Sequence, residues 1–315
     1  MNIDTTLNRD FVIVDLGSSS ARQSTFLKKF SSQITYIEID ALSTSDIQNS
    51  DLYKNIKIKK GVHIERGMKQ FIERNYMACS SFLEIKEGVD IMYGLEDAMK
   101  EKARIDIDCI TLNDILAEHK LDHIDFLKVD LEGLDFDIIK NIENTLPDVN
   151  VIQAVIRFHP LFKGEKHFFE ICQYLSDRGF EFINFSCLDE WKLNTSNQKN
   201  SRDGRMVWGD FVFFRKLDKS ATGFTADLLK QILVSKSLQF NSYAEFLLES
   251  NRPFFDAELY QEVNKVIRTF GSLELFFNNL FGVFARSKLI YPIRKLLRYV
   301  YKRSRIHPTL KQTVP

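Results

Sequence analysis

The stretch that most constrains the fold is FVIVDLGSSSARQSTFL, residues 11–27. An apolar run rich in β-branched residues ends at an acid, Asp15, and a glycine turn follows at Gly17. The chain then continues into a segment with helical composition. A buried strand, a tight turn and a helix start in this order are typical of α/β proteins that hold a nucleotide beyond the end of a strand. The composition of the turn indicates which nucleotide fits.

The turn argues against two classes of phosphate-bearing ligand. A Walker-type loop needs G-x-x-x-x-G-K-[ST], and no lysine stands at the required place. A dinucleotide loop needs G-x-G-x-x-G, but Ser19 occupies the position of the second glycine and the third glycine is missing. Asp15 would also place an anion beside the pyrophosphate. An NAD-dependent oxidoreductase therefore ranks low.

S-adenosylmethionine suits the turn better, because it has no phosphate and carries a sulfonium and an ammonium group. Asp15 can face that cationic end, and close backbone approach is required only near Gly17. We predict that Ser18 and Ser19 either donate hydrogen bonds to the methionine carboxylate or cap the following helix. The alternative that this turn only caps the helix and holds no ligand stays open at this point.

Two acids, Glu38 and Asp40, end a second apolar run at residues 34–40. An acid about 20 residues after a glycine turn commonly accepts hydrogen bonds from both ribose hydroxyls of a nucleotide. The alternative is a solvated charge at the end of a strand. Asp130 ends a further strand-like run, so we expect Asp15, Glu38 and Asp130 to converge at one edge of a sheet.

Short β-branched runs alternate with helical patterns from residue 11 to about residue 215, which predicts a doubly wound, Rossmann-like, mostly parallel sheet with helices on both faces. The expected strands are 11–16, 34–40, 55–64, 125–131, 149–159, 179–186 and 206–216, and the expected helices are 20–30, 111–120, 134–146 and 166–179. The last two strands are expected to pair antiparallel at one edge. Residues 65–108 fit the alternation poorly. We predict one domain over residues 1–216 and a helical extension over 217–315.

The segment ITLNDILAEHKLDHIDFLKVDLEGLDFDIIKN, residues 110–141, resembles the signature of FkbM-type S-adenosylmethionine-dependent methyltransferases, in which a helix precedes a strand that ends in D-x-E-G. Three further stretches resemble the family in the same order: NYMACSSF, the segment IRFHPLFKGEKHFFEICQYLSDRGFEF, and RMVWGDFVFFRK with Gly209 and Asp210 matched. The resemblance covers about residues 11–216. It implies a class I methyltransferase fold, S-adenosylmethionine as cofactor, and methyl transfer to an oxygen, commonly a hydroxyl of a sugar or natural product.

The sequence departs from the family pattern at several positions. Ser19 and Ala21 stand where glycine or alanine is more frequent, Ile39 follows Glu38 where proline is usual, and Arg157 replaces a common acid. These changes would alter the fit to the methionine moiety or, if Arg157 lies near the acceptor, the substrate preference. They also leave open a non-catalytic nucleotide- or glycan-binding module of the same fold.

Two residues are candidates for accepting the proton of the acceptor hydroxyl. Asp130 is the first, because it lies at the expected methyl position, where it would also serve in cofactor binding. His159 is the second, because an imidazole accepts a proton near pH 7. Each has a simpler explanation, since Asp130 and Glu132 can cap a helix and a histidine before a proline is often structural. Two acids at this spacing are weak grounds for a cation, so we predict no metal.

The charge is unevenly distributed, although the chain as a whole is neutral, which argues against a nucleic-acid partner. From Lys216 onward there are 16 Lys and Arg against 8 Asp and Glu. Residues 286–305 hold eight Lys and Arg and no acid, with apolar residues at helical spacing, which predicts peripheral contact with an anionic membrane or a helix docked on the protein itself. The four cysteines form no C-x-x-C pair, and no secretory signal or long apolar run is present, so we expect a cytoplasmic protein.

Overall fold

The computed structural model describes residues 3–7, 11–17, 34–41, 54–195 and 204–268. The chain divides into two compact units, residues 4–239 and residues 1–3 with 240–315. The predicted boundary between residues 216 and 217 stays a prediction.

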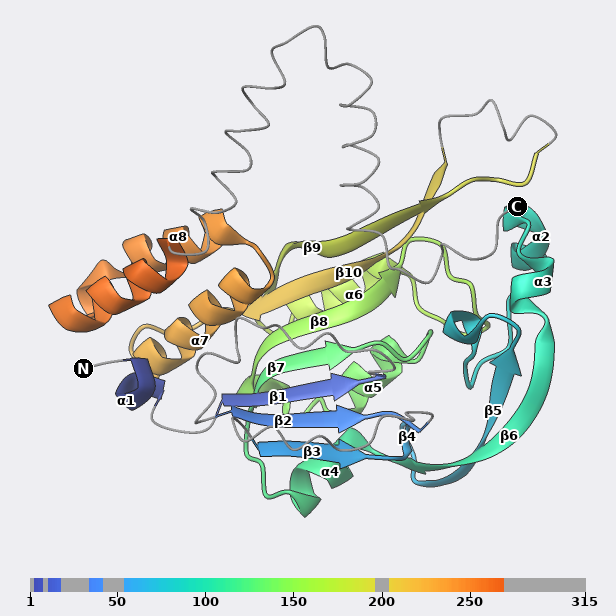
Figure 1. The fold of residues 1–315 in the computed structure, drawn as a ribbon, viewed down its shortest axis with the longest axis horizontal. Coiled ribbons are helices and arrows are strands. Elements are labelled where there is room, and N and C mark those ends of the chain that lie inside the picture. Colours follow the sequence, from blue (N-terminus) through green and yellow to red (C-terminus); the bar gives the residue numbers. More distant parts are fainter. Residues whose placement is uncertain (1–2, 8–10, 18–33, 42–53, 196–203, 269–315) are drawn as a thin grey trace, which may run out of the picture. The chain divides into compact units, whose positions relative to one another are not determined.

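Within the described residues of the unit 4–239, seven strands form one sheet in the order β3-β2-β1-β7-β8-β10-β9 (Figure 1). These strands are β1 (Phe11–Leu16), β2 (Ile34–Ile39), β3 (Lys54–Ile58), β7 (Ile124–Val129), β8 (Val149–Arg157), β9 (Phe180–Trp191) and β10 (Arg205–Arg215). The first five in the order are parallel, and β10 is antiparallel to both β8 and β9. The predicted Rossmann-like sheet with an antiparallel edge is confirmed.

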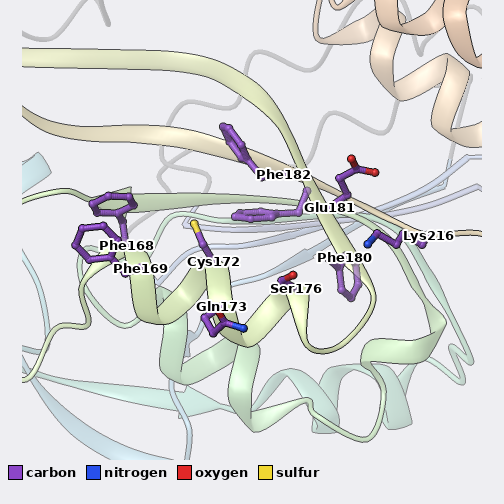
Figure 2. A pocket seen from close by; sticks show the side chains of 10 residues that line it. Phe168, Phe169, Cys172, Gln173, Ser176, Phe180, Glu181, Phe182 and Lys216 are labelled. Carbon is purple, nitrogen blue, oxygen red and sulfur yellow. The ribbon is translucent and has the colours of Figure 1, made fainter.

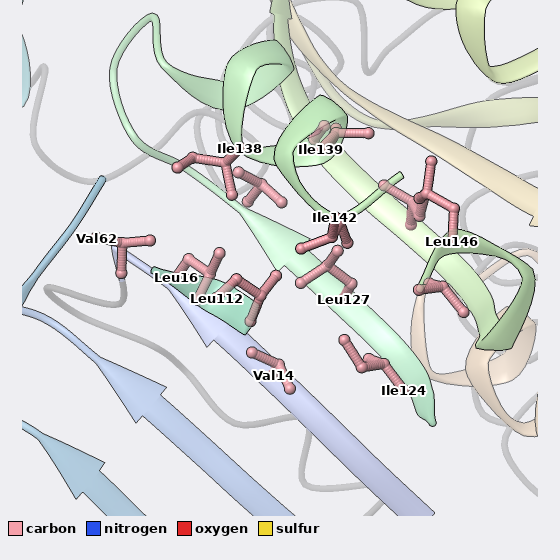
Figure 3. Packing of buried hydrophobic residues seen from close by; sticks show 14 of the residues in the cluster. Val14, Leu16, Val62, Leu112, Ile124, Leu127, Ile138, Ile139, Ile142 and Leu146 are labelled. Atoms are coloured by element: carbon pink, nitrogen blue, oxygen red, sulfur yellow. The ribbon is translucent and has the colours of Figure 1, made fainter. Parts of the chain in front are cut away.

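Alternating side chains place a continuous apolar core on one face of the sheet. Val14 and Leu16 of β1 and Leu127 and Val129 of β7 are fully buried there. The short helices α4 (Leu112–Glu118), α5 (Asp135–Asn141) and α6 (Phe168–Ser176) add apolar side chains to this core. Figure 3 shows Ile138, Ile139 and Ile142 packed over Leu127. Each such side chain contributes roughly 1.5–3 kcal/mol relative to exposure, so this layer fixes the sheet.

A fully buried ion pair joins the helix α7 (Phe224–Ser237) to the sheet. The Lys230 Nζ lies 2.8 Å from Oδ1 of Asp125, and the backbone N–H of Val12 donates to Oδ2 of the same carboxylate at 2.8 Å. Both charged side chains are at most 2% exposed. Asp125 thus links α7, β7 and β1 through one carboxylate.

The segment that fitted the alternation poorly forms a small second sheet, β4-β6-β5, with β4 (Gly61–Val62), β5 (Gly67–Arg74) and β6 (Glu101–Ile110). The expected strand 55–64 is therefore split between two sheets, as β3 and β4. Between β5 and β6 lie the short helices η2 (Met77–Cys79), α2 (Val89–Tyr93) and α3 (Glu96–Met99). Figure 1 shows this insert beyond the arrowheads of the parallel strands, at the carboxyl edge of the main sheet. A hydrogen bond from Ser81 Oγ to the Glu132 carbonyl at 2.7 Å ties it there.

The unit formed by residues 1–3 and 240–315 is helical where it is described. It contains α8 (Asn241–Ser250), the turn η4 (Arg252–Phe254) and a helix over residues 257–268. The remaining short elements of the chain are α1 (Ile3–Leu7) and η3 (Leu146–Asp148). Across the described parts of the chain, no helix has the length and apolar character needed to cross a membrane. The basic stretch 286–305 lies outside the described residues.

Candidate functional site

Four of the predicted site residues meet at the carboxyl edge of the parallel strands. Asp15 is in register with Glu38 on one side and with Lys128 on the other. Gly17 and Asp130 directly follow β1 and β7. The chain leaves β1 toward β2 in one direction while β7 lies in the other, so this is the point where the strand order reverses. Open α/β sheets bind their ligands at such a point.

Gly17 is required by a close approach of two strand ends. Its φ is +81°, and a Cβ built there would lie 1.9 Å from the backbone carbonyl oxygen of Asp130. Its N–H donates to the carbonyl of Ile39 at 2.9 Å, while the N–H of Asp130 donates to the carbonyl of Leu16 at 3.1 Å. Any side chain would therefore push β1 away from β7. The neighbouring Ser18 and Ser19 lie outside the described residues.

Asp15 is buried, and both of its carboxylate oxygens already have a partner in the protein. The Tyr36 hydroxyl donates to Oδ2 at 2.7 Å, and the Lys128 ammonium donates to Oδ1 at 3.2 Å. The same ammonium lies 3.7 Å from Oδ2 of Asp130. Asp15 was predicted to face the cationic end of the cofactor. In this structure it is paired with the Lys128 ammonium, which joins the two acids.

Glu38 lies at the end of β2, with its side chain 14% exposed. Lys57 on β3 is its register neighbour, and the Lys57 Nζ is 3.5 Å from a carboxylate oxygen of Glu38. Asp40 follows the strand, and its N–H donates to the carbonyl of Ile58 at 3.2 Å, which fixes the chain as it leaves the sheet. Both acids thus stand where a ribose contact was predicted, and that role stays a prediction.

A row of polar side chains crosses the sheet on the face opposite the core, and the sequence reasoning did not identify it as a unit. Lys128 is in register with Asp15 and with Gln153, and the strand neighbours of all three are buried core residues. The Gln153 amide donates to Oδ2 of Asp210 on β10 at 3.3 Å. With Tyr36, the row reaches from β2 to β10. Its only sequence signal was a charged residue inside an apolar run, as in FLKVD and GDFVFF.

The charges in this row perturb one another. Burial alone would disfavour the ammonium of Lys128, but the carboxylates of Asp15, Asp130 and Asp210 outweigh it and raise the pKa of Lys128. Burial and the negative charge of Asp130 raise the pKa of Asp210 to about 6. Lys128 is therefore a permanent cation, while Asp210 changes charge near neutral pH.

The D-x-E-G turn that follows β7 is locally fixed. Glu132 and Gly133 have φ values of 48° and 102°, and Asp135 accepts hydrogen bonds from the N–H groups of Leu131 and Gly133, both at 3.1 Å. Asp135, rather than Asp130, thus satisfies the turn. The Asp130 side chain is 32% exposed and available at the carboxyl edge.

Arg157, the departure from the family pattern, is buried and its charge is used inside the protein. The guanidinium forms ion pairs with Glu132 and with Oε1 of Glu165, the latter at 2.8 Å, and it lies over the Phe162 ring at 5.1 Å from the centroid. It joins the turn after β7 to the loop after β8. Asp130 and Glu132 consequently face different cations, Lys128 and Arg157, and among the described residues no cluster of three or more His, Cys, Asp or Glu suits a metal ion.

His159 follows β8 and contacts the insert. Its Nδ1 lies 2.8 Å from the Tyr93 hydroxyl, and the two rings meet edge to face. Burial, with the positive charges of Arg205 and Lys86, lowers the pKa of His159, so the ring is neutral at pH 7. Arg205 also donates to the Tyr93 oxygen. The hydrogen bonds of His159, Tyr93 and Arg205 are compatible when the Tyr93 hydroxyl donates to Nδ1 of His159. The proton of the neutral His159 ring is then on Nε2.

A hollow of about 430 Å³ lies away from these residues, between α6 and β9 (Figure 2). Its lining includes Phe168, Phe169 and Cys172 of α6 and Phe180 and Phe182 of β9. None of the predicted site residues contributes to it. The carboxyl edge of the sheet, and not this hollow, is the candidate functional site.

The comparisons with known proteins gave a match to one protein family. Neither the curated proteins nor the solved structures gave a significant match to this chain. The family described as the Methyltransferase FkbM domain matches residues 51–182, which include the insert, Asp130, the D-x-E-G turn, Arg157 and His159. Residues 51–182, which lie within the compact unit 4–239, therefore match the FkbM methyltransferase family.

Proposed function

We propose that this methyltransferase uses S-adenosylmethionine and methylates a hydroxyl group of a sugar, a glycan or a related metabolite. The observation that carries the proposal is the pairing of Gly17, where no side chain fits, with Glu38 at the adjacent strand end. This pairing lies at the strand-order reversal of a chain that carries an FkbM methyltransferase domain.

The residues present suit this cofactor. Gly17 lets the ends of β1 and β7 approach each other closely, which brings Asp130 beside β1, and the Glu38 carboxylate is suited to accept hydrogen bonds from two ribose hydroxyls. When bound, S-adenosylmethionine supplies a methyl group activated by its sulfonium. The net negative charge of Asp15, Lys128 and Asp130 favours a cationic ligand beside them.

The chain's own residues then have to orient the acceptor and remove its proton. Asp130 is the proposed proton acceptor, because its carboxylate is partly exposed at the carboxyl edge and lies 3.7 Å from the Lys128 ammonium, which orients it. His159 suits this role less well, because its Nε2 carries a proton when Nδ1 accepts from Tyr93. It is better placed to donate a hydrogen bond to an acceptor oxygen.

Calorimetry with S-adenosylmethionine and S-adenosylhomocysteine tests the cofactor. We expect both to bind, and Glu38→Ala to weaken binding by about 1.5–3 kcal/mol, the range for hydrogen bonds to a charged group. Glu118→Ala, at an exposed carboxylate on α4, is the matched control and should bind like the wild type. Absence of binding at millimolar ligand would exclude the proposal. Binding without methyl transfer to any glycan would favour the non-catalytic module instead.

We also propose that residues 286–305 hold the protein on anionic membranes. The support is the sequence alone, with its eight cations and no acid. Full-length protein should co-sediment with anionic liposomes at low salt, and a chain truncated after Ala285 should not. Neutral liposomes are the control. If the full-length chain stays in the supernatant with anionic liposomes, this assignment is wrong.

A further inference from the structure

A connected group of aromatic and cationic side chains lies beside the candidate site, where the insert meets the ends of β8, β9 and β10. Tyr93 contacts His159 through its hydroxyl and Trp191 edge to face, with ring centroids 5.3 Å apart. Arg205 is the cross-strand neighbour of Trp191 and donates to the Tyr93 hydroxyl. We call these residues, together with Lys86, the aromatic–cationic cluster.

The cluster is fixed by the fold and open to solvent. Asn194, just past β9, donates its backbone N–H to the carbonyl of Met92 at 2.8 Å, which holds α2 against the end of β9. Within the cluster Tyr93 is buried, Trp191 and His159 are partly exposed, and Arg205 and Lys86 are exposed. A ligand at this place would meet rings at the base and cations at the rim.

The field at the cluster is positive. Arg205 and Lys86 both act on His159 and lower its pKa. Of the acids nearby, Glu165 is paired with Arg157, whereas Asp189 accepts the neutral indole N–H of Trp191 at 2.9 Å, a contact that supplies no positive charge. The charges that act on His159 itself are mainly positive.

Partly exposed aromatic rings cover the apolar faces of a sugar ring, and a guanidinium with an ammonium binds phosphate or carboxylate. We propose that the aromatic–cationic cluster binds a sugar that carries an anionic group, and that this sugar is the acceptor of methyl transfer. The second half of the statement rests on the proposed function. His159 donates its Nε2–H to the bound sugar. It follows β8, the parallel neighbour of β7, and Asp130 follows β7, so both residues lie at the carboxyl ends of adjacent strands.

The chain contains two tryptophans, and both pack against the apolar residues under the cluster. Intrinsic tryptophan fluorescence therefore reports on this place alone. The full chain is titrated with glucose 6-phosphate, with glucuronic acid and with glucose. We expect a saturable change with at least one anionic sugar and binding of glucose that is at least about tenfold weaker, since tenfold corresponds to one charge-assisted contact. The first two arms distinguish a phosphate from a carboxylate as the anionic group.

Arg205→Gln and Lys86→Gln should each weaken the binding of that anionic sugar about tenfold. Both side chains are exposed, so the variants are expected to fold, and Lys102→Gln on the insert is the matched control. The proposal is wrong if no sugar changes the fluorescence, if glucose binds as tightly as the anionic sugars, or if both variants bind like the wild type.

Calorimetry with S-adenosylhomocysteine separates this proposal from the proposed function. If the homocysteine ligand binds and no anionic sugar does, the cluster proposal fails and the methyltransferase proposal stands. If an anionic sugar binds and the homocysteine ligand does not, the cluster is a sugar site and the cofactor assignment fails. Arg205→Gln should leave the affinity for S-adenosylhomocysteine unchanged, because Arg205 lies on β10 and Glu38 on β2, with three strands between β2 and β10.

Discussion

Replacing Gly17 with alanine isolates the most restrictive packing feature of the site. The residue has φ +81°, which costs an L-amino acid about 1–2 kcal/mol. Its new Cβ would also lie 1.9 Å from the Asp130 carbonyl oxygen, a distance that only a backbone shift can relieve. Such overpacking typically costs about 1–3 kcal/mol. We therefore expect Gly17→Ala to lower the free energy of unfolding by roughly 2–5 kcal/mol.

Gly179→Ala is the matched control, because that glycine has φ +80° and nothing within 4 Å of its ideal Cβ position. It should show only the backbone cost of about 1–2 kcal/mol. Urea denaturation of the two variants gives the packing cost as their difference, and calorimetry of Gly17→Ala should show weakened S-adenosylhomocysteine binding. If the two variants lose the same stability, β1 and β7 are not held in contact at Gly17 and the argument is refuted.

Two further predictions concern buried charges. Lys230→Met should lower the free energy of unfolding at pH 7 by about 3–5 kcal/mol, because it removes the ammonium from the buried Asp125 carboxylate and leaves the His123 imidazole, 3.3 Å from Oδ2, in its place. The loss should shrink toward acidic pH as Asp125 takes up a proton. Urea denaturation at pH 7 and pH 5 measures this, and an equal loss at both would contradict it. Asp210→Asn should raise stability above pH 6 by about 1–3 kcal/mol and flatten its fall with pH between about 4 and 6, since the pKa of Asp210 is raised to about 6 in the fold. A pH series of denaturation midpoints identical to the wild type would refute it.

The sequence predicted the parallel strands because buried strands are continuous apolar runs, and β1, β2, β7 and β8 all have this pattern. It predicted Glu38 and Asp130 at one edge for a related reason, since parallel strands end together. β9 was expected to stop at Ser186 but continues to Trp191, because the antiparallel partner β10 stabilises a stretch whose composition resembles a loop. Strand pairing of this kind overrides local propensity.

No local sequence pattern predicts the polar row across the sheet or the strands of the insert. Lys128 is a single charge in an apolar strand, and only the register shows that Asp15 and Gln153 flank it. In the insert, β5 and β6 pair mainly with each other, and many of their side chains are exposed or half-buried. Neither a continuous apolar run nor a helical period marks such strands. The contact of Tyr93 with His159 joins residues 66 positions apart, and no local pattern encodes it.

The carboxyl edge has two parts, one around Asp15 and Lys128 and the other at the aromatic–cationic cluster, and their charges differ in sign. This difference would help to orient two ligands. Among the residues that the structure describes, the carboxylates of Asp15, Asp130 and Asp210 act on one ammonium, that of Lys128, and their excess of negative charge would favour a sulfonium cofactor. At the aromatic–cationic cluster, beside β8, the field is positive and favours an anionic sugar. Each ligand would be repelled from the site of the other. Electrostatic attraction would therefore direct both ligands to their sites before short-range contacts form. Under the proposed function, the carboxylates of Asp15, Asp130 and Asp210 therefore set the sign of the field at the cofactor half, and Arg205 and Lys86 set the opposite sign at the acceptor half.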